Sequence, residues 1–179
     1  MDVGDYLRIY LADQRAVQAA IVRVATRFAR SNRSTPWNRE LNDLAREVED
    51  DAATLDSVAG ACGADGGAVK RILSLAAERI GRLKLNGHLL TYSPLSRVVE
   101  TEGLMAALTL KREMWLLLGR LQDRHPPLAA FDFGGLVQRA SAQIELLRPI
   151  HEWAADQLAA RTGGSTPDRV RRPRRNRDR

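Results

Sequence analysis

Several residue types that would point to a function are scarce in this chain of 179 residues. Cys62 is the single cysteine, which excludes an internal disulfide and leaves no second thiol for a metal or redox pair. No run approaches the ~18 uncharged apolar residues of a membrane-spanning helix. The residues after Met1 lack the basic and apolar regions of a secretory signal. We therefore expect a protein of a reducing compartment, the cytoplasm, with no membrane span.

Net charge is absent from most of the chain, because it lies entirely in the last nineteen residues. Residues 161–179 hold eight arginines against Asp168 and Asp178, a balance of +6 that equals the formal charge of the whole chain. Val170 is the only large apolar residue after Arg161, so this segment cannot bury enough surface to offset the entropy of ordering. We predict a folded helical bundle domain over 1–160 and a disordered, Arg-rich tail over 161–179.

Strand patterns are missing as well, since no useful stretch alternates apolar and polar residues with period two. Apolar residues instead recur at steps of three and four, which is typical of amphipathic helices. The predicted helices cover about 3–30, 36–61, 69–86, 94–124 and 133–158. The connections are short, and the sequence therefore predicts an all-α, antiparallel bundle of four long helices plus one shorter crossover helix.

Local signals place several helix ends. A hydroxyl residue followed by proline occurs at 34–36 and again at 93–94, and this pair is typical of an N-cap with proline in the first turn. Asp132 is expected to cap the last helix. Pro149 lies inside that helix, where it removes a hydrogen-bond donor, so we expect a kink there.

A polar residue interrupts the apolar stripe near the middle of each long helix. These residues are Gln14, Asp51, Lys111 and Gln143. The antiparallel arrangement allows all four to lie at one height, with Asp51 and Lys111 as the natural charge pair. Such a layer could fix the register of the helices or form the floor of a ligand pocket, and some of its members could simply face solvent.

Polar residues at mid-height of a four-helix bundle are also where di-iron carboxylate proteins place their metal ligands. Those sites need glutamates from two helices and a Glu-x-x-His step from each of the other two. The chain contains no such step, and the lysine in the layer opposes a divalent cation. We therefore expect no metal and no cofactor. A metal site, if one forms, must use carboxylates alone, from Glu47, Asp50, Asp51, Glu100 and Glu102.

The order of hairpin, shorter crossover helix and hairpin is similar to the ferritin-like superfamily. Residues 47–55, 78–87 and 93–104 resemble an actinobacterial branch of that superfamily that lacks the di-iron ligand set. The resemblance covers most of residues 1–160 and implies an antiparallel bundle, often one that associates into homo-oligomers. It implies neither ferroxidase nor storage activity, because the residues that carry those activities are missing here.

Two segments combine features that suit an anion. The linker over 84–96 gathers hydroxyl, histidine and basic side chains next to a helix start, although a capped turn that packs on the bundle explains it equally well. The tail could contact phosphates of a nucleic acid, or an acidic protein, without reading sequence. Its arginines are Arg169, Arg171, Arg172, Arg174, Arg175, Arg177 and Arg179. A solubilising tail is the alternative.

Three hypotheses about function follow. The first is a non-enzymatic ferritin-like bundle that acts through protein contacts. The second is a di-metal carboxylate oxidoreductase or metal-storage protein built on the carboxylates named above. The third is a protein that associates with nucleic acid non-specifically through its basic tail.

Overall fold

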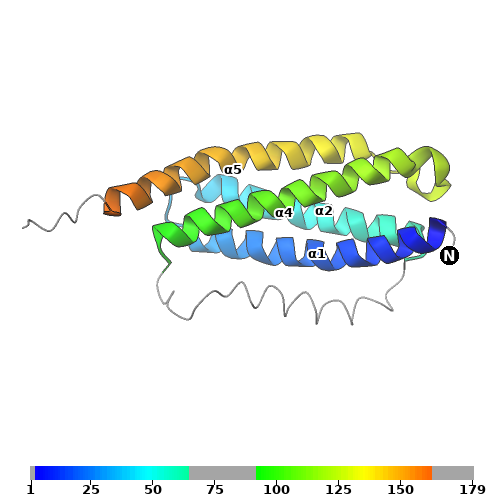
Figure 1. Ribbon diagram of the computed structural model, residues 1–179, viewed down its shortest axis with the longest axis horizontal. Coiled ribbons are helices and arrows are strands. Elements are labelled where there is room, and N and C mark those ends of the chain that lie inside the picture. The colour runs from blue at the N-terminus through cyan, green and yellow to red at the C-terminus, as the bar shows by residue number, and fades with distance from the viewer. Residues whose placement is uncertain (1–2, 65–91, 163–179) are drawn as a thin grey trace, which may run out of the picture.

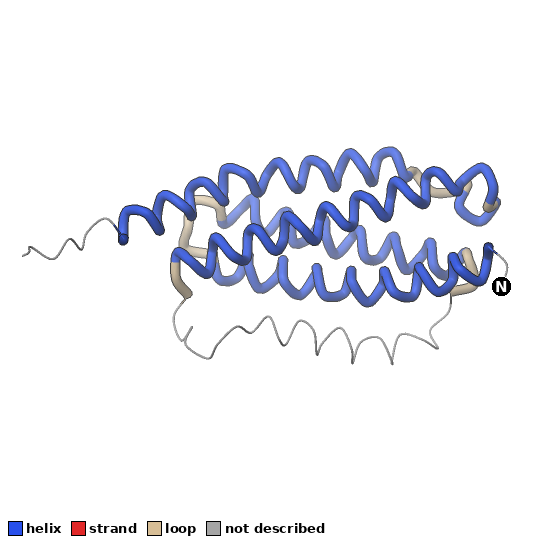
Figure 2. Tube along the Cα trace, in the orientation of Figure 1, coloured by secondary structure: helices blue, strands red, loops and turns tan. Residues whose placement is uncertain are grey.

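The computed structural model describes residues 3–64 and 92–162, and these residues form an all-α bundle (Figure 2). The long helices are α1 (Val3–Ser31), α2 (Asn38–Ala61), α4 (Pro94–Leu121) and α5 (Phe133–Thr162). Two 3-10 turns, η1 (Gln122–Arg124) and η2 (Pro126–Leu128), join α4 to α5. The described ranges contain no strand, which confirms the predicted all-α class. The crossover helix expected at 69–86 lies outside the described residues, as does the tail beyond Thr162.

The four helices form two antiparallel hairpins, α1 with α2 and α4 with α5 (Figure 1). Ala64, just past α2, packs in one core cluster with Leu7 and Leu11 near the start of α1. Tyr92, just before α4, accepts a hydrogen bond from Asn32 at the end of α1, with 2.7 Å between Asn32 Nδ2 and the Tyr92 hydroxyl. Consequently α2 and α4 run in the same direction, and Ala64 and Tyr92 lie at opposite ends of the bundle.

Two predicted helix starts have the expected caps. Ser93 Oγ accepts a hydrogen bond from Ser96 N at 3.2 Å, the Ser96 hydroxyl accepts one from Ser93 N at 3.4 Å, and Pro94 opens α4. Asp132 Oδ1 accepts a hydrogen bond from Gly135 N at 2.9 Å at the start of α5. Each cap satisfies backbone N–H groups that have no partner inside the first helical turn.

The predicted start of α2 was wrong by two residues. The helix begins at Asn38 and has no side-chain cap, because its N-cap residue is Trp37, whose indole has no acceptor atom. The Thr35 hydroxyl donates to Asn32 O at 2.7 Å and accepts from Trp37 N at 3.3 Å. Thr35 N also donates to Asn32 O at 2.9 Å, so this segment closes the α1–α2 turn before the helix starts. Pro36 belongs to that turn.

The end of α4 also differs from the prediction, since the helix ends at Leu121, before the two prolines. The Gln122 side-chain amide donates to the carbonyls of Leu128 and Phe131 at 3.2 and 2.9 Å, and these bonds hold η1 and η2 together. In contrast, α5 continues as one helix through Pro149. Neighbouring hydrogen bonds and tertiary packing therefore outweigh the loss of that single backbone donor.

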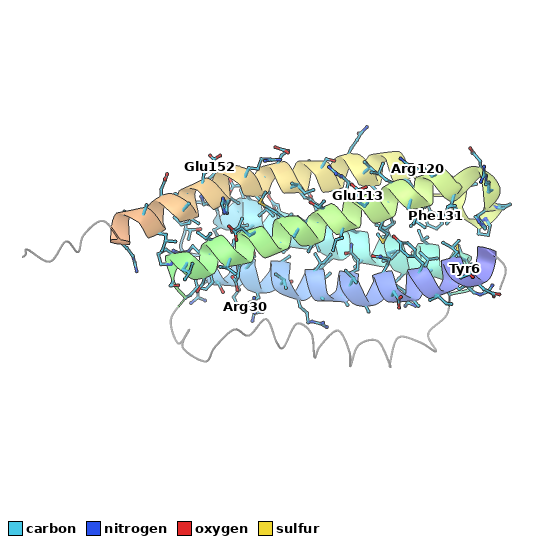
Figure 3. All side chains as sticks on the ribbon, in the orientation of Figure 1. Tyr6, Arg30, Glu113, Arg120, Phe131 and Glu152 are labelled. Atoms are coloured by element: carbon cyan, nitrogen blue, oxygen red, sulfur yellow. The ribbon has the colours of Figure 1, made fainter. Side chains whose placement is uncertain are left out.

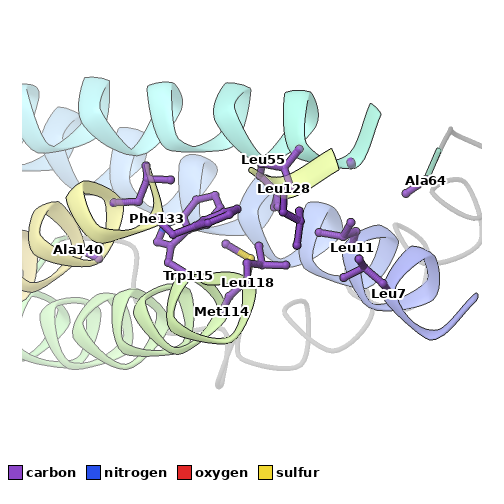
Figure 4. Close-up of a cluster of buried hydrophobic side chains, with 13 residues drawn as sticks. Leu7, Leu11, Leu55, Ala64, Met114, Trp115, Leu118, Leu128, Phe133 and Ala140 are labelled. Carbon is purple, nitrogen blue, oxygen red and sulfur yellow. The ribbon is translucent and has the colours of Figure 1, made fainter. Parts of the chain in front are cut away.

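The core consists of two apolar clusters. One contains Trp115, whose ring centroid lies 6.1 Å from that of Phe133, together with Leu55 and Leu118 (Figure 4). The other is built around Phe28 and extends toward the α1–α2 turn. Along α2, Val48 belongs to one cluster and Leu55 to the other, so Asp51 falls between them. The same holds for Lys111 between Leu108 and Met114 on α4.

Candidate functional site: a buried charged layer

Lys111 and Asp51 form an ion pair in the middle of the bundle, and both side chains are 0% exposed. The Lys111 ammonium contacts Asp51 Oδ2 and also donates a hydrogen bond to Gln143 Oε1. Three helices therefore contribute to the contact: α2 through Asp51, α4 through Lys111 and α5 through Gln143. The structure brings together three of the four residues that the sequence pattern singled out.

Two more charged residues extend this layer to the surface. Arg139, one turn before Gln143 on α5, forms an ion pair with Asp51 Oδ1. Glu47, one turn before Asp51 on α2, accepts a hydrogen bond from Gln143 Nε2 at 2.9 Å. The same amide lies 3.4 Å from Asp51 Oδ2. We call Glu47, Asp51, Lys111, Arg139 and Gln143 the charged layer.

The electrostatics of the charged layer are balanced. Two carboxylates, one ammonium and one guanidinium sum to zero, so no net charge is buried. Burial lowers the pKa of Lys111, and the neighbouring Asp51 carboxylate opposes that change. The Arg139 contact is an ion pair without hydrogen-bond alignment, because Arg139 Nε and Asp51 Oδ1 have no hydrogen-bond partner among the described residues. Lys111 is therefore the residue that supplies Asp51 with a hydrogen-bonded counter-charge at the centre of the layer.

Gln14 does not join this layer. It is half-buried on α1, and no hydrogen bond links it to Asp51, Lys111 or Gln143 in the described structure. Gln18, four residues later, is the buried amide of α1 at 3% exposure, and its Nε2 has no hydrogen-bond partner among the described residues. The sequence pattern misplaced the buried stripe because alanines such as Ala16 belong to the core, whereas Val17 is 37% exposed.

The five carboxylates proposed as metal ligands do not converge on one point, although Glu47 and Asp51 share the Gln143 amide in the charged layer. Glu47 accepts from Gln143, and Asp50 is exposed. Glu100 forms an ion pair with Arg27 at 2.7 Å, and Glu102 lies 3.0 Å from His151 Nε2. Within residues 3–64 and 92–162, no group of three or more His, Cys, Asp or Glu side chains is placed to hold a metal ion.

Only the last part of the linker over 84–96 is described, and it forms a packed cluster. Arg97 Nε donates to the buried Asn32 Oδ1 at 2.9 Å, and its guanidinium lies between two rings, 5.2 Å from the centroid of Tyr92 and 5.4 Å from that of Trp153. Burial and the nearby Glu100 raise the pKa of the Tyr92 hydroxyl. The cluster ties together α1, α4 and α5; the tail arginines Arg169–Arg179 lie outside the described residues.

An open groove of about 350 Å³ lies beside the α1–α2 turn. Its polar lining consists of Thr26, Arg30, Arg33, Asn38 and Asn42. Figure 3 labels Arg30 at this end of α1. The charged side chains in its lining are Arg30 and Arg33, and the nearest carboxylate given by a hydrogen bond is Glu49, which accepts from the Thr26 hydroxyl at 3.4 Å. Helical periodicity does not predict this groove, because its residues come together only through the turn.

Comparison of the chain with models of protein families, with curated proteins and with solved structures finds no match in any of the three. Among the described helices, none combines the length and the apolar character that crossing a membrane requires.

Proposed function

We propose that this protein is a non-enzymatic, ferritin-like helical bundle that acts through protein contacts. The course of the chain supports the ferritin-like part. Ferritin-like folds combine two antiparallel hairpins with one long connection between them. Here α2 and α4 run in the same direction, and the described ends at Ala64 and Tyr92 lie at opposite ends of the bundle.

The position of Lys111 is the observation that carries the non-enzymatic part. Its ammonium sits at mid-height among side chains of α2 and α5, where ferritin-like enzymes bind cations with carboxylates. A fixed positive charge at this point repels a divalent ion, and it already uses the Asp51 carboxylate that such an ion would need. The charged layer is thus a structural substitute for a metal centre.

The basic groove beside the α1–α2 turn supports the proposed protein contacts. Arg30 and Arg33 present two guanidinium groups, and Asn38 and Asn42 add amide groups. Guanidinium groups pair with carboxylates in a bidentate manner, so the groove suits an acidic segment of a partner protein.

Elemental analysis of the full-length protein, purified without added metal, tests whether the charged layer excludes the metal centre of a ferritin-like oxidoreductase or storage protein. The expected metal content is far below one ion per chain. Stoichiometric iron or manganese would overturn the proposal. Lys111→Gln serves as a comparison, because it removes the cation but keeps polar atoms in the layer.

Titration with a decaglutamate peptide at low salt tests the groove. Arg30→Glu together with Arg33→Glu should weaken binding several-fold relative to the unchanged chain. Arg120→Glu with Arg124→Glu makes the same charge change at exposed positions of the opposite end. Equal loss in both variants would mean that general charge, and not the groove, attracts the peptide.

A further inference from the structure

Gln18 of α1 is buried in the bundle but lacks a hydrogen-bond partner. Its side chain is 3% exposed, and its Nε2 has no partner among the described residues. A buried amide donor that stays unpaired costs free energy, so native proteins pair such groups with protein atoms or with bound water. Gln18 therefore needs an acceptor inside the bundle.

The other buried polar side chains of the described residues form two groups that are already paired. One group lies around the start of α4, where each member has a hydrogen-bond partner, and consists of Asn32, Ser96 and Thr101. The other is the centre of the charged layer, made of Asp51, Lys111 and Gln143. The depth of Gln18 in the bundle decides which group it can join.

The register of α1 and α4 places Gln18 level with Lys111. Arg97 of α4 donates to Asn32 of α1, with 2.9 Å between Arg97 Nε and Asn32 Oδ1. Gln18 lies fourteen residues before Asn32, and Lys111 lies fourteen residues after Arg97. The two helices run in opposite directions, and equal numbers of residues span equal lengths along them. Both side chains therefore lie at the same height.

The apolar clusters give Gln18 the same position. On α1, Leu11 belongs to the cluster of Trp115, and Ile21 belongs to the cluster of Phe28. Gln18 follows Leu11 by seven residues and precedes Ile21 by three, which places it on the core-facing stripe of α1. It thus lies between the two clusters, as the charged layer does.

The Lys111 ammonium can donate one more hydrogen bond at this height. An ammonium group has three N–H donors, and the described residues supply two acceptors, Asp51 Oδ2 and Gln143 Oε1. Lys111 is 0% exposed, so bulk solvent does not accept from the third N–H. Gln18 Nε2 is also a donor, so the two groups need an acceptor between them.

We propose that one water molecule binds between Lys111 Nζ and Gln18 Nε2. Its two lone pairs accept one hydrogen bond from each group. Asp51 Oδ1 lacks an aligned hydrogen bond and supplies an acceptor in the same layer for a hydrogen of the water. Buried waters typically make about three hydrogen bonds, which this site provides. The water extends the charged layer to α1, so all four long helices of the described structure contribute to it.

A crystal structure of the full-length chain, at a resolution that shows ordered water, tests the site directly. We expect one density peak at about 3 Å from both Lys111 Nζ and the Gln18 side-chain amide. No peak between these groups would overturn the proposal. A Gln18 Oε1 that accepts directly from Lys111 Nζ would also overturn it.

Oxygen-17 magnetic relaxation dispersion counts long-lived internal waters in solution. Gln18→Leu should have one such water fewer than the unchanged chain, because leucine has no polar atom to hold it. Gln14→Leu makes the same change one turn earlier, at a half-buried position outside the charged layer, and should leave the count unchanged. Equal counts in all three proteins would contradict the site.

Urea denaturation shows whether Gln18 acts through Lys111. Gln18→Leu should lower the folding equilibrium constant several-fold in the unchanged chain, because the third N–H of Lys111 loses its partner. In a Lys111→Met, Asp51→Leu background the same substitution should cause no such loss, since no buried ammonium needs the water there. Equal losses in the two backgrounds would mean that Gln18 contributes only by packing, against the proposal.

Discussion

Lys111 of α4 and Asp51 of α2 face each other across the bundle core, and neither side chain touches solvent. Burial of two charges costs several kcal/mol for each ion, and only close pairing offsets that cost. Arg139 and Gln143 add further partners from α5. The pair therefore adds little to the net free energy of unfolding. Its main effect is to fix how α2, α4 and α5 are aligned with one another.

Removal of one member of the pair should be costly. Lys111→Met leaves the Asp51 carboxylate buried with a single ion-pair partner, and we expect a loss of about 3–5 kcal/mol in the free energy of unfolding. Lys111→Met combined with Asp51→Leu removes both charges and should restore a large part of that loss. Urea denaturation measures both effects, and Arg112→Met, next in sequence but at the surface, serves as control. A double variant as unstable as the single one would refute the pairing argument.

The stability of the bundle should depend on pH through Lys111. Burial lowers the pKa of the folded-state lysine below its ordinary value of 10.5. Between the two values the unfolded chain binds more protons, so this group increases the free energy of unfolding as pH rises toward 10.5. The difference between the unchanged chain and Lys111→Met should therefore grow in favour of lysine as pH rises from the lowered pKa of the folded state toward 10.5. Urea denaturation at several pH values measures it, and a difference that shrinks would contradict the assignment.

Tyr92 should change the pH dependence of the free energy of unfolding in the opposite direction to Lys111. Its pKa is raised above the ordinary 10.0, so the unfolded chain loses this proton first and the folded state loses stability as pH rises past that value. Tyr92→Phe removes this alkaline loss. At neutral pH the variant should cost about 1 kcal/mol, because the hydrogen bond from Asn32 disappears. Ultraviolet titration of the phenol groups should show that one late-titrating tyrosine is missing in the variant.

The start of α5 offers a test of the cap. Gly135→Ala places a Cβ against the Asp132 carboxylate, which must move away from the backbone N–H that it accepts from. We expect a net loss smaller than the roughly 1 kcal/mol of Asp132→Ala, because the better helix propensity of alanine offsets part of the lost cap. Gly60→Ala near the end of α2 meets no atom within 4 Å and should instead stabilise the helix slightly. Thermal unfolding compares the three variants, and equal effects of the two alanines would exclude the cap as the cause.

The helical periodicity of the sequence was sufficient to place Asp51, Lys111 and Gln143 on buried faces near mid-height. It misplaced Gln14, because an α1 face rich in alanine looks less apolar in sequence than it is in the packed bundle. Periodicity also could not identify Arg139, since a long side chain on the rim reaches inward only when a buried carboxylate lies within its length.

The basic groove shows a second limit of prediction from sequence. Arg30 and Asn42 belong to different helices, and their meeting depends on the geometry of the α1–α2 turn. That turn departs from the capping pattern expected at 34–36, because the N-cap residue of α2 is Trp37. Local signals predict where helices exist, but the surface made by two helices depends on how the chain reverses between them.

The location of the charged layer between the two apolar clusters has a consequence for assembly. Consider a shift of the α4–α5 hairpin along α1–α2 by one helical turn, about 5.4 Å, toward Leu55. The Lys111 ammonium would then lie among the apolar side chains of that cluster, and the Asp51 carboxylate would lose its partner. Apolar contacts alone would tolerate such a slide, since leucines replace one another readily. Lys111 therefore selects one register of the two hairpins. Several registers allow apolar contacts, but only one pairs every buried charge with its counterpart.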